Sequence, residues 1–300
     1  MDIYAALVEP KIHFVLISPY EPVGSGFADL GSLGSDVLEL VGQWAGSRAR
    51  GFLELNLVRT DWRRPKVPLS QGLDGLRDRY LAALETSPGT GFEIAFNGNG
   101  KTATSAWLSL GLHTESDSTQ AVVFTASLQR ENNDERIKHA SDDAELIAGL
   151  ARAGVSHLGA VHCGASFGSF GYYALQITMN RGEIIAASEA DVVRGYDWLQ
   201  VLTPGMVERL RSEGRDMEAV PAEVVAPARG PNGEPYLVCR ARRSPYECDV
   251  SAQRAFRSFV LPVLVKSGPP SLDSPVAMNG AARPPEILPD DWWPSAPQNG

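Results

Sequence analysis

The sequence has few cysteines and no long hydrophobic run, and both shortages exclude whole classes of protein. Its 300 residues contain three cysteines, Cys163, Cys239 and Cys248. An odd and sparse number is not a disulfide framework and is typical of a reducing compartment, although the sequence leaves a Cys239–Cys248 pair open. No apolar stretch approaches the roughly 20 residues of a membrane span. The N-terminus lacks the positive start and the cleavage site of a signal peptide. We therefore expect a cytoplasmic protein with no membrane contact.

Positive charge is also scarce. Lys and Arg number 27 against 36 Asp and Glu, which gives a net charge of −9. An acidic field repels polyphosphate, so we do not expect a nucleic-acid partner. The same field would attract a basic partner. The alternative interpretation is that mild acidity only keeps the protein soluble.

Apolar spacing alternates between helical and strand periods along the chain. Helical spacing occupies 33–44, 72–85 and 251–261, and Thr203-Pro204 is a typical helix start. Strand alternation occupies 51–60, 91–96, 104–112, 121–128, 157–163, 172–179 and 183–188. These patterns predict an α+β fold, with mainly antiparallel sheet and packed helices, and they allow two similar halves.

The chain divides by composition into a long body and a short tail. We predict a single α+β domain over 1–265, with a subdivision allowed near 129–143, and an irregular proline-rich tail over 266–300. The polar stretch 131–145 predicts an exposed connection into a helix that Ser141 caps. Its Asp142 and Asp143 would then be solvated carboxylates at the helix start.

One glycine-rich segment imitates a phosphate-binding loop. GNGKT (98–102) has the ending of such a loop, but the first glycine of that motif is replaced by Ala95. A strand pattern follows where the motif needs a helix. Asn-Gly tolerates the positive φ angles of a tight turn, so the segment predicts a β-hairpin instead.

A second segment imitates a hydrolase nucleophile. GASFG (164–168) has the G-x-S-x-G form around Ser166, but all five histidines precede it, whereas the hydrolase order places His last. We favour a flexible glycine loop. Cys163 follows His162 directly. Adjacent residues of a strand face opposite sides, so these two side chains could not easily pair with each other. His157, five residues before His162, would also face the side opposite to His162 in a regular strand. A serine or cysteine hydrolase using Ser166 or Cys163 stays the alternative.

No metal or cofactor site is expected. Cys239 and Cys248 are separated by eight residues, and the chain contains no H-x-x-x-H and no paired C-x-x-C. We assign no catalytic residue from the sequence.

Two segments resemble a known group of proteins. GFEIAFNGNGKTATSAWLSLGL (91–112) and GYDWLQVLTPGMVERL (195–210) resemble a strand-turn-strand and a later strand-helix element of predicted immunity proteins from bacterial polymorphic toxin systems. That hairpin usually carries Trp before Asn-Gly, where this chain has Phe96. The resemblance implies a non-enzymatic protein that binds a cognate toxin, a basic one being favoured, and occludes it. A phage-derived structural or assembly protein is a further alternative.

Overall fold

The computed structural model combines helices with one antiparallel sheet. It describes residues 11–20, 26–46, 51–57, 66–68, 74–86, 92–98, 105–114, 120–130, 133–160, 162–167, 191, 193, 198–248 and 250–263. Across these residues the sheet has ten strands in the order β3-β2-β4-β5-β6-β1-β7-β8-β10-β9. Every neighbouring pair runs antiparallel. The predicted α+β class is confirmed.

The elements have the following bounds. The strands are β1 (Lys11–Tyr20), β2 (Gly51–Leu57), β3 (Lys66–Pro68), β4 (Phe92–Gly98), β5 (Ser105–Thr114), β6 (Gln120–Gln129), β7 (His162–Phe167), β8 (Leu199–Leu202), β9 (Val224–Arg229) and β10 (Pro235–Arg240). The α-helices are α2 (Gly26–Gly46), α3 (Asp74–Thr86), α4 (Asn133–Leu158), α6 (Pro204–Ser212) and α7 (Val250–Val260). Short 3₁₀ turns are η3 (Met217–Ala219), η4 (Pro245–Glu247) and η5 (Leu261–Val263).

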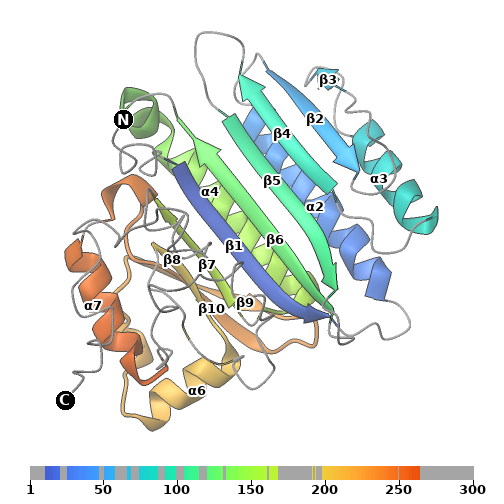
Figure 1. Cartoon of the computed structure of the whole chain (residues 1–300). Helices are drawn as coiled ribbons and strands as arrows, with labels where there is room; N and C mark the ends of the chain where they lie inside the picture. The colour runs from blue at the N-terminus through green and yellow to red at the C-terminus, as the bar shows by residue number, and fades with distance from the viewer. Residues whose placement is uncertain are drawn as a thin grey trace, which may run out of the picture.

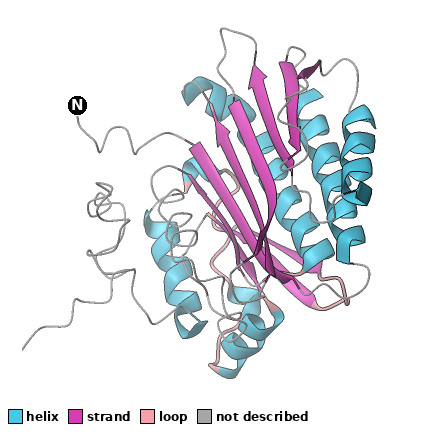
Figure 2. Ribbon diagram, turned by 45° about the vertical axis from the view of Figure 1, so that its right-hand side comes forward, coloured by secondary structure: helices cyan, strands magenta, loops and turns pink. Residues whose placement is uncertain are grey.

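Helices cover the two faces of the sheet unequally. The larger core packs α2, α3 and α4 together with one face of β1, β6, β7, β8 and β10 (Figures 1 and 2). A smaller core joins α6, α7 and η5 to the opposite face of β8 and β10. Within the described ranges, no helix has the length and apolar character needed to span a membrane.

Strand alternation explains this layering. Phe14 of β1 is paired with Ala126 of β6, which is paired with Leu108 of β5, so one register row is apolar. Phe14 also packs edge-on against Phe124, with ring centroids 5.3 Å apart. Because alternate residues face opposite sides of a strand, apolar residues at every second position form one face on which helices can pack.

Several predicted elements are confirmed. Strands β4 and β5 pair as predicted for a hairpin, and a strand follows Lys101-Thr102 rather than a helix. The hairpin turn itself lies outside the described residues. Thr203 caps α6, since its Oγ accepts a hydrogen bond from the Met206 N–H at 3.2 Å. The strands predicted at 172–179 and 183–188, and the proline-rich tail, also lie outside the described residues.

The start of α4 differs from the prediction. The stretch 131–145 is not an exposed connection, because α4 already begins at Asn133. Its first turns carry mostly polar side chains, and even their Ile137 is exposed. Glu135, however, pairs with Lys138 at 3.8 Å and with His139 at 3.4 Å. Such pairs three and four residues apart stabilise a polar helical segment. The predicted strand at 157–163 is also partly wrong, since α4 continues to Leu158.

The earlier helix start places Asp143 in the interior. Asp143 is fully buried rather than solvated, on the same face of α4 as Ile147 and Leu150. Its carboxylate accepts hydrogen bonds from Trp44 Nε1 at 2.9 Å, from Arg130 Nε at 2.8 Å and from the Tyr246 hydroxyl at 2.8 Å. Arg130 Nη2 also donates to it. The carboxylate therefore ties together α2, the end of β6, α4 and η4.

The same contacts decide the ionisation of Asp143. Burial alone raises the pKa of this carboxyl, but the hydrogen bonds and charge of Arg130, with those of Trp44 and Tyr246, outweigh it and lower the pKa below its usual value. Arg130, itself buried, lies over the Trp44 ring with its Cζ 5.6 Å from the centroid. Removing one member of such a buried pair costs about 3–5 kcal/mol, because the other charge stays in the interior.

We predict that Tyr246→Phe lowers the free energy of unfolding by about 1.5–3 kcal/mol at pH 7, the range for hydrogen bonds to charged groups. A group with a lowered folded-state pKa contributes stability that is present above its unfolded pKa, near 4, and is lost as the pH falls through the folded value. The difference from wild type should therefore shrink below about pH 4. Urea unfolding between pH 7 and pH 3 measures it.

Tyr236→Phe is the matched control. The Tyr236 hydroxyl accepts a bond from the Ala160 N–H at 3.4 Å and touches no carboxylate of the Asp143 cluster. The effect of Tyr236→Phe on the free energy of unfolding should therefore be the same at pH 7 and at pH 3. A Tyr246→Phe deficit that stays constant down to pH 3 would contradict the assigned role of Asp143.

Candidate functional site

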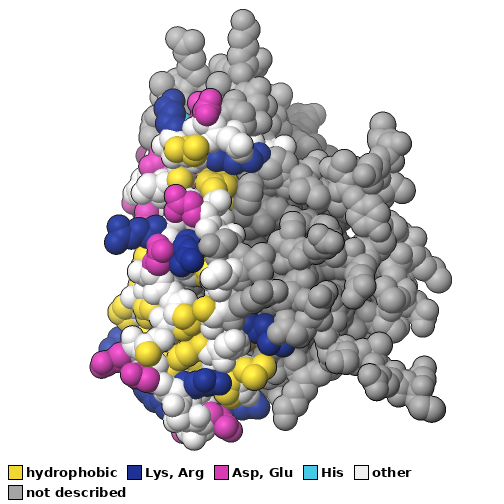
Figure 3. All heavy atoms as spheres, turned by 90° about the vertical axis from the view of Figure 1, so that its left-hand side faces the viewer, with side chains coloured by type: hydrophobic (Ala, Val, Ile, Leu, Met, Phe, Trp, Pro, Cys, Tyr) yellow, Lys and Arg dark blue, Asp and Glu magenta, His cyan; other side chains and the backbone are white. Residues whose placement is uncertain are grey.

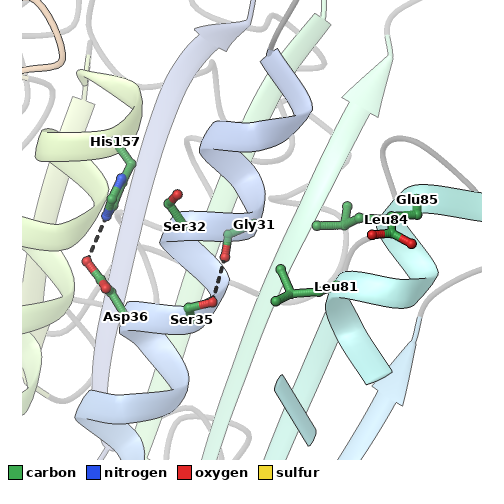
Figure 4. A pocket seen from close by; sticks show the side chains of 8 residues that line it. All are labelled: Gly31, Ser32, Ser35, Asp36, Leu81, Leu84, Glu85 and His157. Carbon is green, nitrogen blue, oxygen red and sulfur yellow. Dashed lines mark hydrogen bonds and ion pairs between the residues drawn. The ribbon is translucent and has the colours of Figure 1, made fainter. Parts of the chain in front are cut away.

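A groove crosses the outer surface of α2, between α3 on one side and α4 on the other. It is lined by Gly31, Ser32, Ser35, Asp36, Leu81, Leu84, Glu85 and His157 (Figure 4). It encloses about 700 Å³. That volume lies within the range of about 300–1,000 Å³ for ligand pockets, so the groove can hold a few side chains or a small molecule.

Small residues of α2 bring α3 close enough to form one wall of this groove. A Cβ at Gly34 would overlap the Tyr80 ring, and a Cβ at Gly31 would lie 3.2 Å from Leu81 Cδ2. The buried Tyr80 hydroxyl donates to the Leu30 carbonyl at 3.1 Å. Because Tyr80 is seated in this way, Leu81 and Leu84 lie beside the outer surface of α2.

The ionisable groups of the groove are two carboxylates and one imidazole. His157, in the last turn of α4, donates from Nε2 to Asp36 Oδ2 of α2 at 2.7 Å. Glu85, in the last turn of α3, lies across the groove from this pair (Figure 4). Among the residues that the structure describes, neither Lys nor Arg belongs to the lining. By contrast, the face of the molecule in Figure 3 intersperses basic and acidic side chains.

The groove does not have the geometry of nucleophilic catalysis. A triad needs a hydroxyl hydrogen-bonded to the imidazole that an acid orients. Ser35 Oγ donates instead to the Gly31 carbonyl at 3.0 Å. Among the described residues, no hydrogen bond joins Ser32 or Ser35 to His157. The arrangement is suited to holding a cation beside an apolar group.

The candidate nucleophiles from the sequence lie elsewhere. Cys163 is fully buried in β7, next to the buried His162. Ser166 belongs to the same strand and pairs in register with His13. The interpretation of residues 164–167 as a glycine loop was wrong, since β7 runs through them to Phe167. His157 was also wrongly placed on that strand, because it belongs to α4.

The other two cysteines form no disulfide. Cys239 and Cys248 are both free thiols. Cys239 is buried in β10, and burial raises the pKa of its thiol to about 12, so it stays protonated. In the part of the chain that the structure describes, no group of three or more His, Cys, Asp and Glu side chains is placed to hold a metal ion.

Sequence reasoning missed the groove because its walls come from distant segments. Residues 31–36, 81–85 and 157 meet only when α2, α3 and α4 pack together. Gly31, Gly34 and Ser35 gave one usable signal, since small residues three and four apart are a typical site for close helix packing.

Comparison with known proteins gives little further information. No family model matches the chain, and no curated protein matches it. Among solved structures, the chain is similar to the Pseudomonas aeruginosa T6SS protein PA0821, with 11% identity and a TM-score of 0.48. The match covers 86% of this chain and 75% of that chain. At this identity and TM-score the likeness carries no argument about what this chain does.

We predict that Gly34→Ala destabilises the protein by about 1–3 kcal/mol, the range for overpacking, because the new methyl group displaces Tyr80. Gly75→Ala is the matched control, since a Cβ at Gly75 meets nothing within 4 Å. In a helix that change should be neutral or stabilise by up to about 1 kcal/mol. Thermal unfolding of both variants measures the difference. Equal effects would contradict the close approach of α2 and α3.

We predict that iodoacetamide labels Cys248 in the native protein and leaves Cys163 and Cys239 unmodified. Cys248 is partly exposed, whereas the other two are buried, and alkylation needs an accessible thiolate. Mass spectrometry of tryptic peptides gives the modified fraction, and denatured protein serves as the control in which all three react. Fast labelling of native Cys163 would overturn its assignment as an inert core residue.

Proposed function

We propose that this chain is a non-enzymatic binding protein that neutralises a cognate bacterial toxin by occluding it. The observation that supports this function best is the groove on α2. There Asp36 and Glu85 flank the apolar Leu81, and neither Lys nor Arg is among the described lining residues. Such a surface favours a basic partner with apolar side chains at the contact.

The placement of the reactive side chains favours binding over catalysis. Cys163 and Cys239 are buried, and Cys239 stays protonated at neutral pH. The His157–Asp36 pair has no nucleophile hydrogen-bonded to it within the described ranges. These features support a role that needs recognition and no covalent chemistry, in line with the resemblance of 91–112 and 195–210 to immunity proteins.

The acidity of the chain supports a basic toxin as the partner. With a net charge of −9, the protein would attract a cationic partner over distances comparable to the Debye length, about 8–10 Å at physiological salt. Complementary fields mainly raise the association rate. A fast encounter is useful for an inhibitor that must reach its toxin before the toxin reaches its target.

The test is to search the genes that flank the gene of this chain for a toxin and to produce that toxin together with the chain. We expect the chain to restore growth of a bacterial host and to form a stable complex on gel filtration. Titration of purified toxin should end at one chain per toxin, because occlusion is stoichiometric. Inactivation of the toxin at far lower molar ratios of chain to toxin indicates an enzyme. Toxin activity that is unchanged in an excess of this chain would refute the proposed function.

A further inference from the structure

We infer that the groove lined by Gly31, Ser35, Leu81 and Glu85 accepts one short helical segment of the partner, which places a Lys or Arg side chain against Glu85 and an apolar side chain against Leu81. This inference rests on the proposed function and adds the surface and the chemistry of the contact. The groove has the components of helix-in-groove recognition, namely two apolar side chains one helical turn apart, Leu81 and Leu84, with the carboxylate of Glu85 beside them.

Glu85 is the residue that we assign to the partner's cation. It is exposed, and it forms no ion pair with any described residue. It lies in the last turn of α3, which carries no basic residue. The C-terminal end of a helix bears partial negative charge, so it repels a carboxylate placed there. A nearby cation would neutralise both the helix end and the carboxylate. A partner Lys or Arg would relieve this repulsion, which no described residue of the chain relieves through an ion pair.

The other wall of the groove is already fixed. Asp36 is held by His157 at 2.7 Å, and His157 lies at the C-terminal end of α4, where a donor is favourable. This pair adds to the buried packing of α2 against α4, so the wall is present before a partner binds. A preformed site loses less conformational entropy on association.

The α3 wall of the groove supplies the apolar contact. Leu84 is 7% exposed and Leu81 is half-buried, so both rest on the core while one of them keeps surface available. Gly31 and Ser35 have small side chains, so the adjacent surface of α2 does not protrude into the groove. A partner side chain can therefore reach Leu81 without displacing a large residue.

The experiment compares two charge reversals of equal size. Glu85→Lys changes the groove, and Glu208→Lys, at an exposed position of α6, is the matched control with the same net charge. The probe is a fluorescent synthetic helix with Leu at positions i, i+3, i+4 and i+7 and Lys elsewhere. We expect wild type and Glu208→Lys to bind it equally at low salt, and Glu85→Lys to bind about tenfold more weakly.

A second measurement separates lost contact from lost folding. Lys at the C-terminal end of a helix is favourable, so Glu85→Lys should unfold at the same temperature as wild type or above it. A second probe with Glu in place of every Lys should bind Glu85→Lys better than it binds wild type. No binding of the Lys probe to wild type, or equal loss in both variants, would overturn the inference. So would a wild-type dimer that Glu85→Lys dissociates, because a second copy would then be the occupant.

The two proposals fail in different ways. If the Lys probe binds as expected but an excess of this chain leaves the toxin active, the groove is supported as a binding site and the proposed toxin neutralisation is refuted. If the chain neutralises the toxin and Glu85→Lys does so with the same affinity, the proposed function stands and the groove is not its interface.

Discussion

The carboxylate of Asp143 accepts hydrogen bonds from Trp44, Arg130 and Tyr246 in a position closed to water. Each donor comes from a different element, so a single buried charge sets the positions of α2, the end of β6, α4 and η4. Such a cluster is stable only while every member is paired. The packing of the helical layer on the sheet therefore depends on it.

The groove follows from that packing. Trp44 and Asp143 hold α2 beside α4, and this places His157 within hydrogen-bonding distance of Asp36. Gly34 then admits Tyr80, which brings α3 against the other side of α2. The candidate site is thus a surface consequence of interior contacts, and its shape should be lost whenever those contacts are weakened.

Charge has two distinct roles in this protein. In the interior, Arg130 and Asp143 neutralise each other, and on the C-terminal part Arg240 and Arg242 pair with Glu145 and Glu223 at 2.8 Å and 3.5 Å. At the groove, Glu85 has no cation from the described residues of its own chain. We propose this carboxylate, beside the partly exposed Leu81, as the point of contact with a basic partner.

The sequence by itself determined the α+β class, the β4–β5 pairing, and the α3 and α6 helices, because apolar periodicity and the Thr203 cap are local signals. It could not determine the start of α4, since the polar residues at 133–142 suit a solvated loop and a helix with ion pairs equally well. Only tertiary packing decided that Asp143 is buried, because its partners lie 13 to 103 residues away. The groove was decided in the same way, by three helices whose outer faces carry no long-range signal in the sequence.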